Sequence, residues 1–287
     1  MMEAHERDAN EVKSAASFAA PQSDRCRTKH PVVLVHGLGF RDRKLLNYWG
    51  RIPKALEDEG AWVFYSHQDA WGTIEHNAAM VKRAVLAALE KTGAEKVNLL
   101  AHSKGGLDSR YMISALDMED KVASLTTIST PHHGSKTMDF LLRWPHWMYR
   151  FAGVFVDLFF KILGDKKPTF YRTSCQMETA ACAKFNEEMQ DADGVYYQSY
   201  AAALRTAHRD IIFMLVHRIV KQFDGDNDGV VSVESSPWGE FHGEFIGTEL
   251  QGLSHGDLVD MHRRDVKGID IRAAYKEIVS GLKDKGF

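Results

Sequence analysis

The sequence predicts an α/β protein with a mostly parallel central sheet and helices on both faces. After residue 30, short apolar runs alternate with longer segments of helical periodicity, which is typical of parallel strands joined by helices. A second observation is a serine that stands where one apolar run passes directly into a helical segment. A third is that an aspartate and a histidine follow this serine, each beside a glycine. These observations predict one α/β domain over residues 30–287.

Strands are predicted at residues 32–35, 62–65, 97–100, 123–128, 195–200 and 241–246, and helices at residues 45–59, 73–91 and 271–282. Thr73 is a suitable N-cap for the second helix. Val81, Val85 and Leu89 recur along one face of that helix, as expected when a helix packs on a sheet. Residues 138–190 break the alternation with helical, aromatic-rich sequence, so we predict an insertion that lies over the sheet.

The composition is that of an ordinary globular protein. Hydrophobic residues make up 44% of the chain and charged residues 26%, so a chain of 287 residues can bury a sizeable core. The net charge of -3 gives no sign of a nucleic-acid partner. Cys26, Cys175 and Cys182 make an odd count without metal-type spacing, and we expect reduced thiols.

The first 29 residues are polar and of mixed charge, and they contain no apolar stretch of the kind that a secretory signal requires. We expect a flexible leader over residues 1–29 and a cytoplasmic protein, with secretion by a non-standard route left open. The most apolar segment, residues 151–163, is too short to span a bilayer and contains Asp157 and Lys161. The sequence therefore predicts no transmembrane segment.

The serine is Ser103, in the stretch VNLLAHSKGG at residues 97–106. A strand that turns into a helix at a serine forces a strained backbone there, and the positions two before and two after must be small. Ala101 and Gly105 stand at those positions, with alanine in place of the usual glycine at the first. The pattern predicts that Ser103 is a nucleophile.

An acylating serine needs a base, an orienting carboxylate and donors for the oxyanion. Asp228 precedes Gly229 and an apolar pair, as expected for a loop after a strand, and His255 stands in a later loop. The expected oxyanion donors are backbone N–H groups, one from Lys104 after the nucleophile and one from Leu38 in the glycine-rich loop after the first strand.

Five motifs in this order resemble those of the bacterial triacylglycerol lipases of the α/β-hydrolase superfamily, in particular the Pseudomonas and Bacillus types. They are PVVLVHGLGF at 31–40, VNLLAHSKGG at 97–106, TTISTPHHGS at 126–135, NDGVV at 227–231 and SHGDLVDM at 254–261. The resemblance covers roughly residues 30–265 and implies an α/β-hydrolase fold. It also implies Ser103 as nucleophile, Asp228 as acid and His255 as base, with Leu38 and Lys104 as oxyanion donors.

No cofactor is required for this chemistry, but the resemblance implies a structural calcium ion. In both lipase groups an acidic residue two positions after the catalytic histidine helps to bind calcium, and Asp257 stands there. Met261 departs from the pattern, because the Pseudomonas type has an amide side chain at that position.

Other polar clusters admit more than one interpretation. Asp224, Asp226 and Asp228 match the start of an EF-hand loop, but Ser235 replaces its final glutamate, so we expect the first two to be solvated loop carboxylates or partners of the acid. His67, Asp69 and His76 could be assembled into a zinc site of the kind that some larger Bacillus-type lipases have. The extra segment that houses this site is missing here, and we expect ordinary loop histidines.

Two histidine pairs lie beside the motifs. We expect His132 and His133 to be packing and hydrogen-bonding residues. His36 and His102 flank the predicted catalytic loops, where we expect them to orient the backbone.

Residues 140–163 are predicted to form a lid over the serine. They carry Trp144, Trp147, Tyr149 and five phenylalanines among few charges. An apolar helix there could close over the acyl pocket and contact a lipid surface when it opens. The alternatives are a permanently buried helix or a dimer interface.

The sequence therefore predicts a serine carboxylic-ester hydrolase that cleaves acyl esters such as triacylglycerols through an acyl-enzyme. A polyester depolymerase or a phospholipase would use the same triad. A catalytically silent hydrolase-fold binding protein is the alternative outside the enzymes, although such proteins usually lose a triad member.

Overall fold

The structure is a computed structural model that describes residues 21–39, 41–42, 47–143, 145–205, 211–245, 252–266 and 268–287. Side chains are described outside residues 211–215. Several predicted features lie partly outside the described residues: residues 1–20 of the leader, Phe40 of the first motif, residues 45–46 of the first helix, Trp144 of the lid, and Ile246 of the last strand.

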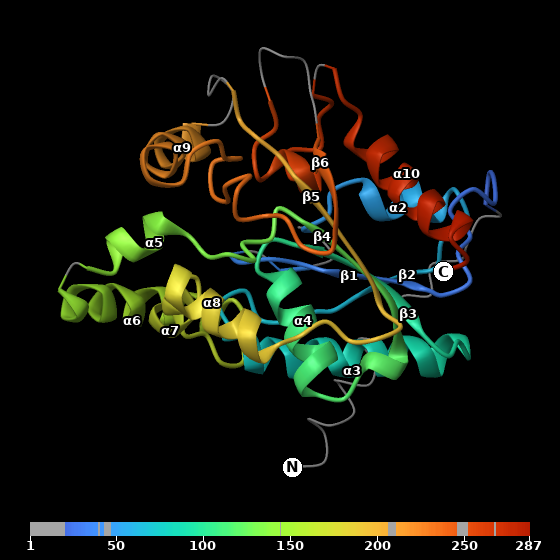
Figure 1. Ribbon diagram of the computed structural model, residues 1–287, viewed down its shortest axis with the longest axis horizontal. Coiled ribbons are helices and arrows are strands. Elements are labelled where there is room, and N and C mark those ends of the chain that lie inside the picture. The colour runs from blue at the N-terminus through green and yellow to red at the C-terminus, as the bar shows by residue number, and fades with distance from the viewer. Residues whose placement is uncertain are drawn as a thin grey trace.

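The described residues contain a sheet of six parallel strands in the order β2-β1-β3-β4-β5-β6 (Figure 1). The strands are β1 (Val32–Val35), β2 (Val63–Tyr65), β3 (Val97–His102), β4 (Val122–Ile128), β5 (Tyr196–Ala201) and β6 (Glu240–Glu244). Every residue of β1, β3 and β4 is buried, because helices cover both faces of a parallel sheet. The α/β fold class predicted from the sequence is confirmed.

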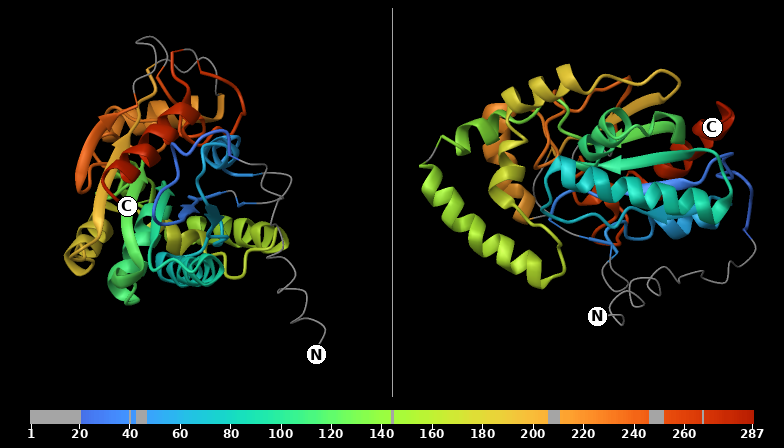
Figure 2. Two further views of the ribbon diagram at one scale, coloured as in Figure 1. Left: turned by 90° about the vertical axis from the view of Figure 1, so that its right-hand side faces the viewer. Right: turned by 90° about the horizontal axis from the view of Figure 1, so that it is seen from below.

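Two helical layers enclose the sheet (Figure 2). The side chains of β1 point alternately to the two faces of the sheet. Val32 and Leu34 pack against α2 (Ile52–Glu57) and α10 (Ile271–Asp284), whereas Val33 and Val35 pack on the opposite face. That opposite face is covered by α3 (Ile74–Thr92) and α4 (Gly105–Ala115).

The N-terminus of α3 is capped as predicted, because the Thr73 side chain accepts the His76 N–H. Along this helix Val81 and Val85 are buried and Leu89 is half-buried. The predicted helix at 45–59 is shorter in the structure and begins at Ile52, where Pro53 occupies its first turn.

Four helices follow one another between β4 and β5, and a fifth lies between β5 and β6. They are α5 (Lys136–Leu141), α6 (His146–Ile162), α7 (Phe170–Cys175), α8 (Thr179–Glu188) and α9 (Ile211–Asp224). Two short 3-10 helices, Glu119–Lys121 and Asp257–Val259, complete the described elements. The helix α9 is not predicted from the sequence, and the Asp228 loop follows this helix rather than the expected strand.

Asp224, the last residue of α9, is buried and holds the start of α5. Its carboxylate accepts the N–H groups of Lys136 and Thr137 at 2.8 Å each and the Thr137 hydroxyl at 2.6 Å. A carboxylate at a helix N-terminus satisfies donors that have no partner within the helix. The expectation that Asp224 is solvated or partners the acid is therefore wrong, whereas Asp226 is exposed beside Lys221.

Candidate active site

Ser103 occupies a sharp turn between β3 and α4. Its φ is +56°, a conformation that costs free energy in a residue with a side chain. The turn is held by hydrogen bonds from the Ser103 N–H to the Ile128 carbonyl (3.0 Å) and from the Thr130 hydroxyl to the Ser103 carbonyl (2.7 Å). The strand-to-helix elbow predicted from the sequence is present.

The residues around Ser103 are small because neighbouring backbone and side-chain atoms leave no room for a Cβ. A Cβ atom on Gly105 would lie 2.5 Å from the carbonyl oxygens of Val35 and His36, and one on Gly106 would lie 2.3 Å from the Thr130 hydroxyl. A Cβ on Gly37 would lie 2.6 Å from Cβ of Ser103. The glycine-rich loop after β1 therefore lies directly against the serine.

The buried Asp228 pairs with the partly buried His255. The Nδ1–H of His255 donates to Oδ2 of Asp228 at 2.6 Å, and the His255 backbone N–H donates to the Asp228 carbonyl at 2.8 Å. The other carboxylate oxygen accepts the N–H groups of Val230 and Val231 at 2.9 and 2.8 Å. Such bonds satisfy the acceptors of a fully buried carboxylate, and the bond from Nδ1 fixes the tautomer of the imidazole.

Asn227 shapes the loop that carries Asp228, a role that the sequence analysis does not assign. Its side-chain oxygen accepts the Gly229 N–H at 2.8 Å and lies 2.9 Å from Nδ1 of His217 on α9. The Asn227 carbonyl accepts the Leu204 N–H just beyond β5. These bonds bring Asp228 back to the carboxyl end of the sheet.

His102 connects the pair to the elbow, because it directly precedes Ser103 and its ring centroid lies 4.3 Å from that of His255. Burial, reinforced by the neighbouring charge of His255, lowers the pKa of His102 well below its usual value. The neutral ring accepts a hydrogen bond at Nδ1 from the Tyr48 hydroxyl, 2.7 Å away.

The same Tyr48 hydroxyl accepts the Gly37 N–H at 3.1 Å, so Tyr48 ties the glycine-rich loop to the elbow. The sequence analysis missed it, since a tyrosine in a long loop carries no motif. Among the residues that the structure describes, no acceptor takes the N–H of Leu38 or of Lys104. Both predicted donors are thus available to a ligand at Ser103.

His36 holds the glycine-rich loop from its other side. Its ring nitrogens lie 2.8 Å from the Gly37 carbonyl and 3.0 Å from the Gln68 carbonyl, and the Gln68 side chain donates to the His36 carbonyl at 2.7 Å. Burial lowers the pKa of His36 to about 4, opposed by the two carbonyl oxygens that face its ring nitrogens. His36 orients backbone as expected, whereas the printed contact of the His102 ring is with the Tyr48 hydroxyl and not with backbone, so that part of the expectation is wrong.

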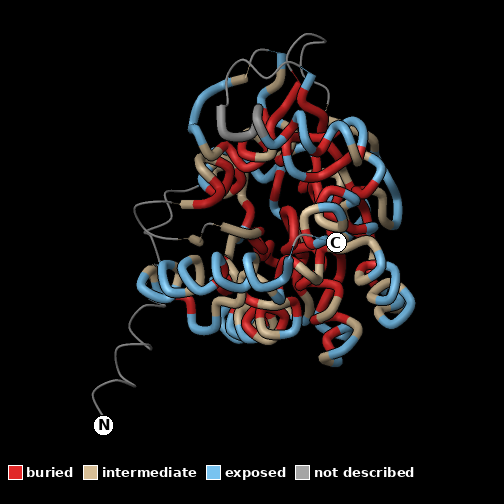
Figure 3. The backbone as a smooth tube through the Cα atoms, turned by 90° about the vertical axis from the view of Figure 1, so that its left-hand side faces the viewer, coloured by how far each residue is buried: buried red, intermediate tan, exposed pale blue. Residues whose placement is uncertain are grey.

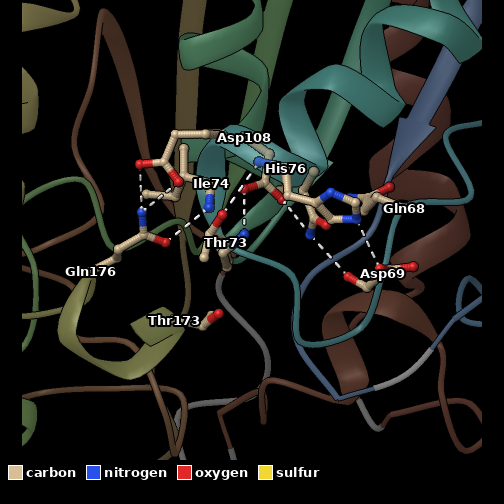
Figure 4. Close-up of polar contacts among 12 residues, drawn as sticks. Gln68, Asp69, Thr73, Ile74, His76, Asp108, Thr173 and Gln176 are labelled. Carbon is tan, nitrogen blue, oxygen red and sulfur yellow. Dashed lines mark hydrogen bonds and ion pairs between the residues drawn. The ribbon is translucent and has the colours of Figure 1, made fainter. Parts of the chain in front are cut away.

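The Lys104 side chain is buried and pairs with Asp108 one turn further along α4. Asp108 also accepts a 3.2 Å hydrogen bond from Asn77 on α3. Burial lowers the pKa of Lys104 and raises that of Asp108 to about 6. Figure 4 places Asp108 beside the start of α3, where Gln176 accepts the Ile74 N–H. The pair therefore joins the residue after the nucleophile to the helical layer.

The loop that follows His255 is fixed by protein groups. Asp257 accepts the Ser254 N–H at 3.1 Å, and Asp260 accepts the backbone N–H of Arg51 at 2.7 Å and two guanidinium bonds at 2.8 Å each.

The described residues contain no group of three His, Cys, Asp or Glu side chains arranged to hold a metal. A calcium ion at Asp257 stays a prediction, and no step below depends on it.

The remaining candidates have structural partners. His132 is buried between Thr127 (3.0 Å) and the Trp238 ring, as expected of a packing residue. His76 pairs with Asp69 at 2.9 Å (Figure 4). Asp224 and Asp226 do not join Asp228 in a calcium loop, because Asp224 caps α5.

A serine at a strained elbow, near an aspartate–histidine pair at the carboxyl edge of a parallel sheet, defines a hydrolase-type site. The profile of the alpha/beta hydrolase fold family matches residues 30–228, so the chain belongs to that family. Triacylglycerol lipase 2 of Saccharomyces cerevisiae is 28% identical over 84% of this chain and 75% of its own length. The triacylglycerol lipase of Burkholderia plantarii is 43% identical over 44% of this chain and 37% of its own length.

Solved structures share the fold. The lipase of Staphylococcus hyicus has a TM-score of 0.66 at 17% identity, covering 93% of this chain and 99% of that one. A metagenomic carboxyl esterase has a TM-score of 0.69 at 16% identity, covering 90% of this chain and 76% of that one.

The buried Lys104–Asp108 pair predicts a large stability effect. Lys104→Met leaves the Asp108 carboxyl buried without its cation, which we expect to cost about 3–5 kcal/mol in the free energy of unfolding. The matched control is Lys184→Met, which removes an exposed pair of the same spacing with Glu188 and is expected to cost less than about 1 kcal/mol. Denaturant unfolding measures the free energy of unfolding of both variants. Equal losses would contradict the conclusion that the Lys104–Asp108 pair is buried.

Proposed function

We propose that the chain is a serine carboxylic-ester hydrolase that cleaves acyl esters such as triacylglycerols. The observation that carries the proposal is the strained Ser103, whose neighbour His102 packs against His255 of the Asp228–His255 pair. Ser103 attacks the ester carbonyl while His255 takes its proton and passes it to the leaving alcohol. Asp228 holds the imidazole tautomer, and water then releases the acyl group from Ser103.

The oxyanion is bound by the N–H groups of Leu38 and Lys104 in this proposal. Tyr48 supports the arrangement because it engages the neighbouring Gly37 N–H and turns the glycine-rich loop against Ser103. The names of the yeast and Burkholderia relatives support a lipid ester as substrate. No observation favours a polyester, a phospholipid or a silent binding role over this substrate class, and the cytoplasmic location stays a prediction.

Covalent labelling tests the nucleophile. A fluorophosphonate should label the wild-type protein once, and Ser103→Ala should remove the label because no hydroxyl remains to be phosphonylated. Intact-protein mass spectrometry measures the adduct. Labelling that survives the substitution would place the nucleophile elsewhere.

Three neighbouring aspartates give three different expected outcomes. Asp228→Asn should lower turnover about 10⁴-fold in folded protein, because the imidazole loses its orienting carboxylate. Asp224→Asn should lower the free energy of unfolding by about 1–3 kcal/mol through the α5 cap and spare turnover. Asp226→Asn, exposed, should change stability by less than about 0.5 kcal/mol. Turnover and denaturant unfolding are measured for the three variants. The assignment of Asp228 as the acid is wrong if Asp226→Asn impairs turnover most.

We also propose that α6 acts as a lid. Within this helix only Gly153 is buried, so the structure excludes a helix buried permanently within the chain. Trp147, Phe151, Phe155 and Phe159 are more than half exposed, and covering such a surface is favourable by about 25 cal/mol per Å². Among the described residues, no helix is long and apolar enough to cross a membrane.

Interfacial kinetics test the lid. Activity on a short triglyceride should jump once the substrate exceeds its solubility, and Phe155→Asp or Phe159→Asp should blunt the jump while hydrolysis of a soluble ester persists. Leu86→Asp is the control, since Leu86 is an exposed apolar residue on α3. If the α6 substitutions unfold the protein or split a dimer, α6 is structural.

A further inference from the structure

One face of α6 presents a continuous apolar surface to solvent. Its exposed apolar side chains are Trp147, Met148, Phe151, Val154, Phe155, Leu158, Phe159 and Ile162. The helix has 17 residues and is therefore about 25 Å long. Figure 3 views the side of the molecule on which α6 lies in Figure 1. A surface of this extent indicates a binding partner.

The opposite face of α6 is attached to the protein. Gly153 faces Phe170 and Tyr171 of α7, the Asp157 carboxylate accepts the Phe170 N–H at 2.6 Å, and Phe160 lies against Trp71 at 6.1 Å between ring centroids. The apolar face is thus directed outward.

Exposed cations accompany this apolar face, on α6 and in the segments that flank it. Residues 143–172 contain six Lys and Arg side chains and two Asp side chains, in a chain of net charge -3. The six cations are Arg143, Arg150, Lys161, Lys166, Lys167 and Arg172, all exposed. Both acids are engaged by backbone, Asp157 by Phe170 and the buried Asp165 by the Trp71 N–H at 3.0 Å.

The cations lie close enough to α6 to contact the same external surface as its apolar face. Arg150 and Lys161 are eleven residues apart, which is three helical turns, so they lie along one side of α6. Lys166 and Lys167 follow the end of the helix near the exposed Ile162, and their backbone N–H groups are fixed to Asp69 at 2.8 and 2.7 Å. Long cationic side chains beside an apolar stripe are typical of helices that lie in a lipid interface.

We propose that α6 and its six cations bind an anionic phospholipid surface, so that the enzyme acts on esters at a negatively charged membrane. The inference deepens the proposed lid and rests on it. A neutral lipid surface would use the apolar residues but not the cations. A second copy of the chain would bring like-charged rims together, which is unfavourable.

The test uses the full chain with Ser103→Ala, so that vesicles are not hydrolysed. Sedimentation with vesicles of phosphatidylcholine alone or with phosphatidylglycerol added should show stronger binding to the anionic vesicles, weakened by salt. Lys161→Gln/Lys166→Gln/Lys167→Gln should weaken anionic binding about 100-fold, since each cation near such a surface contributes about fivefold. Phe155→Ser should weaken binding to both vesicle types.

The control variant, Arg83→Gln/Lys91→Gln/Lys121→Gln, removes three exposed cations outside α6 and its flanks and should bind as the parent does. The proposal is overturned if the protein binds both vesicle types equally, or if the two triple variants lose vesicle binding equally. It is also overturned if the protein does not bind vesicles but forms a dimer that dissociates in Phe155→Ser. Hydrolysis of a soluble ester is measured separately on the chain with Ser103 intact. Loss of that activity would count against the proposed function while leaving the vesicle result to stand.

Discussion

The positive φ of Ser103 is the constraint on which the site depends. It turns the chain within one residue from a buried strand into a helix, and it leaves no room for side chains at Gly37 and Gly105. Such strain persists only where the surroundings determine it. Here the surroundings are the end of β4 and the residues after it. The Ile128 carbonyl and the Thr130 hydroxyl hold the two sides of the turn. The glycine-rich loop then comes close to Ser103 because the elbow projects above the sheet.

Neutral aromatic and imidazole groups complete the site around this elbow. His102 is kept uncharged by burial beside His255, so its Nδ1 can accept from Tyr48, whose oxygen in turn accepts the Gly37 N–H. One hydroxyl thereby fixes the spacing between the elbow and the loop that carries Leu38. The buried Asp228 carboxylate is held by three donors, the N–H groups of Val230 and Val231 and the His255 ring.

Buried carboxylates also attach the loops that sheet packing alone would leave loose. Asp224 joins α9 to α5, Asp260 joins the histidine loop to Arg51, and Asp69 holds the chain that follows α6. Each takes several donors because an isolated buried charge is very unfavourable. The exposed cations of the α6 region have the opposite arrangement: they lie at the surface, where the described residues leave them available to an anion.

The sequence by itself determined the alternation of strands and helices, the Thr73 cap and the elbow, because these depend on local periodicity and on small residues at fixed spacing. It also indicated Asp228 and His255, although their pairing needs α9 and the Asn227 turn to return the chain to the carboxyl edge of the sheet. Only the tertiary structure decided the roles of Tyr48, Asp224 and the Lys104 side chain. Their partners lie on other elements, and the free energy of a buried polar group depends on which partners the fold brings to it.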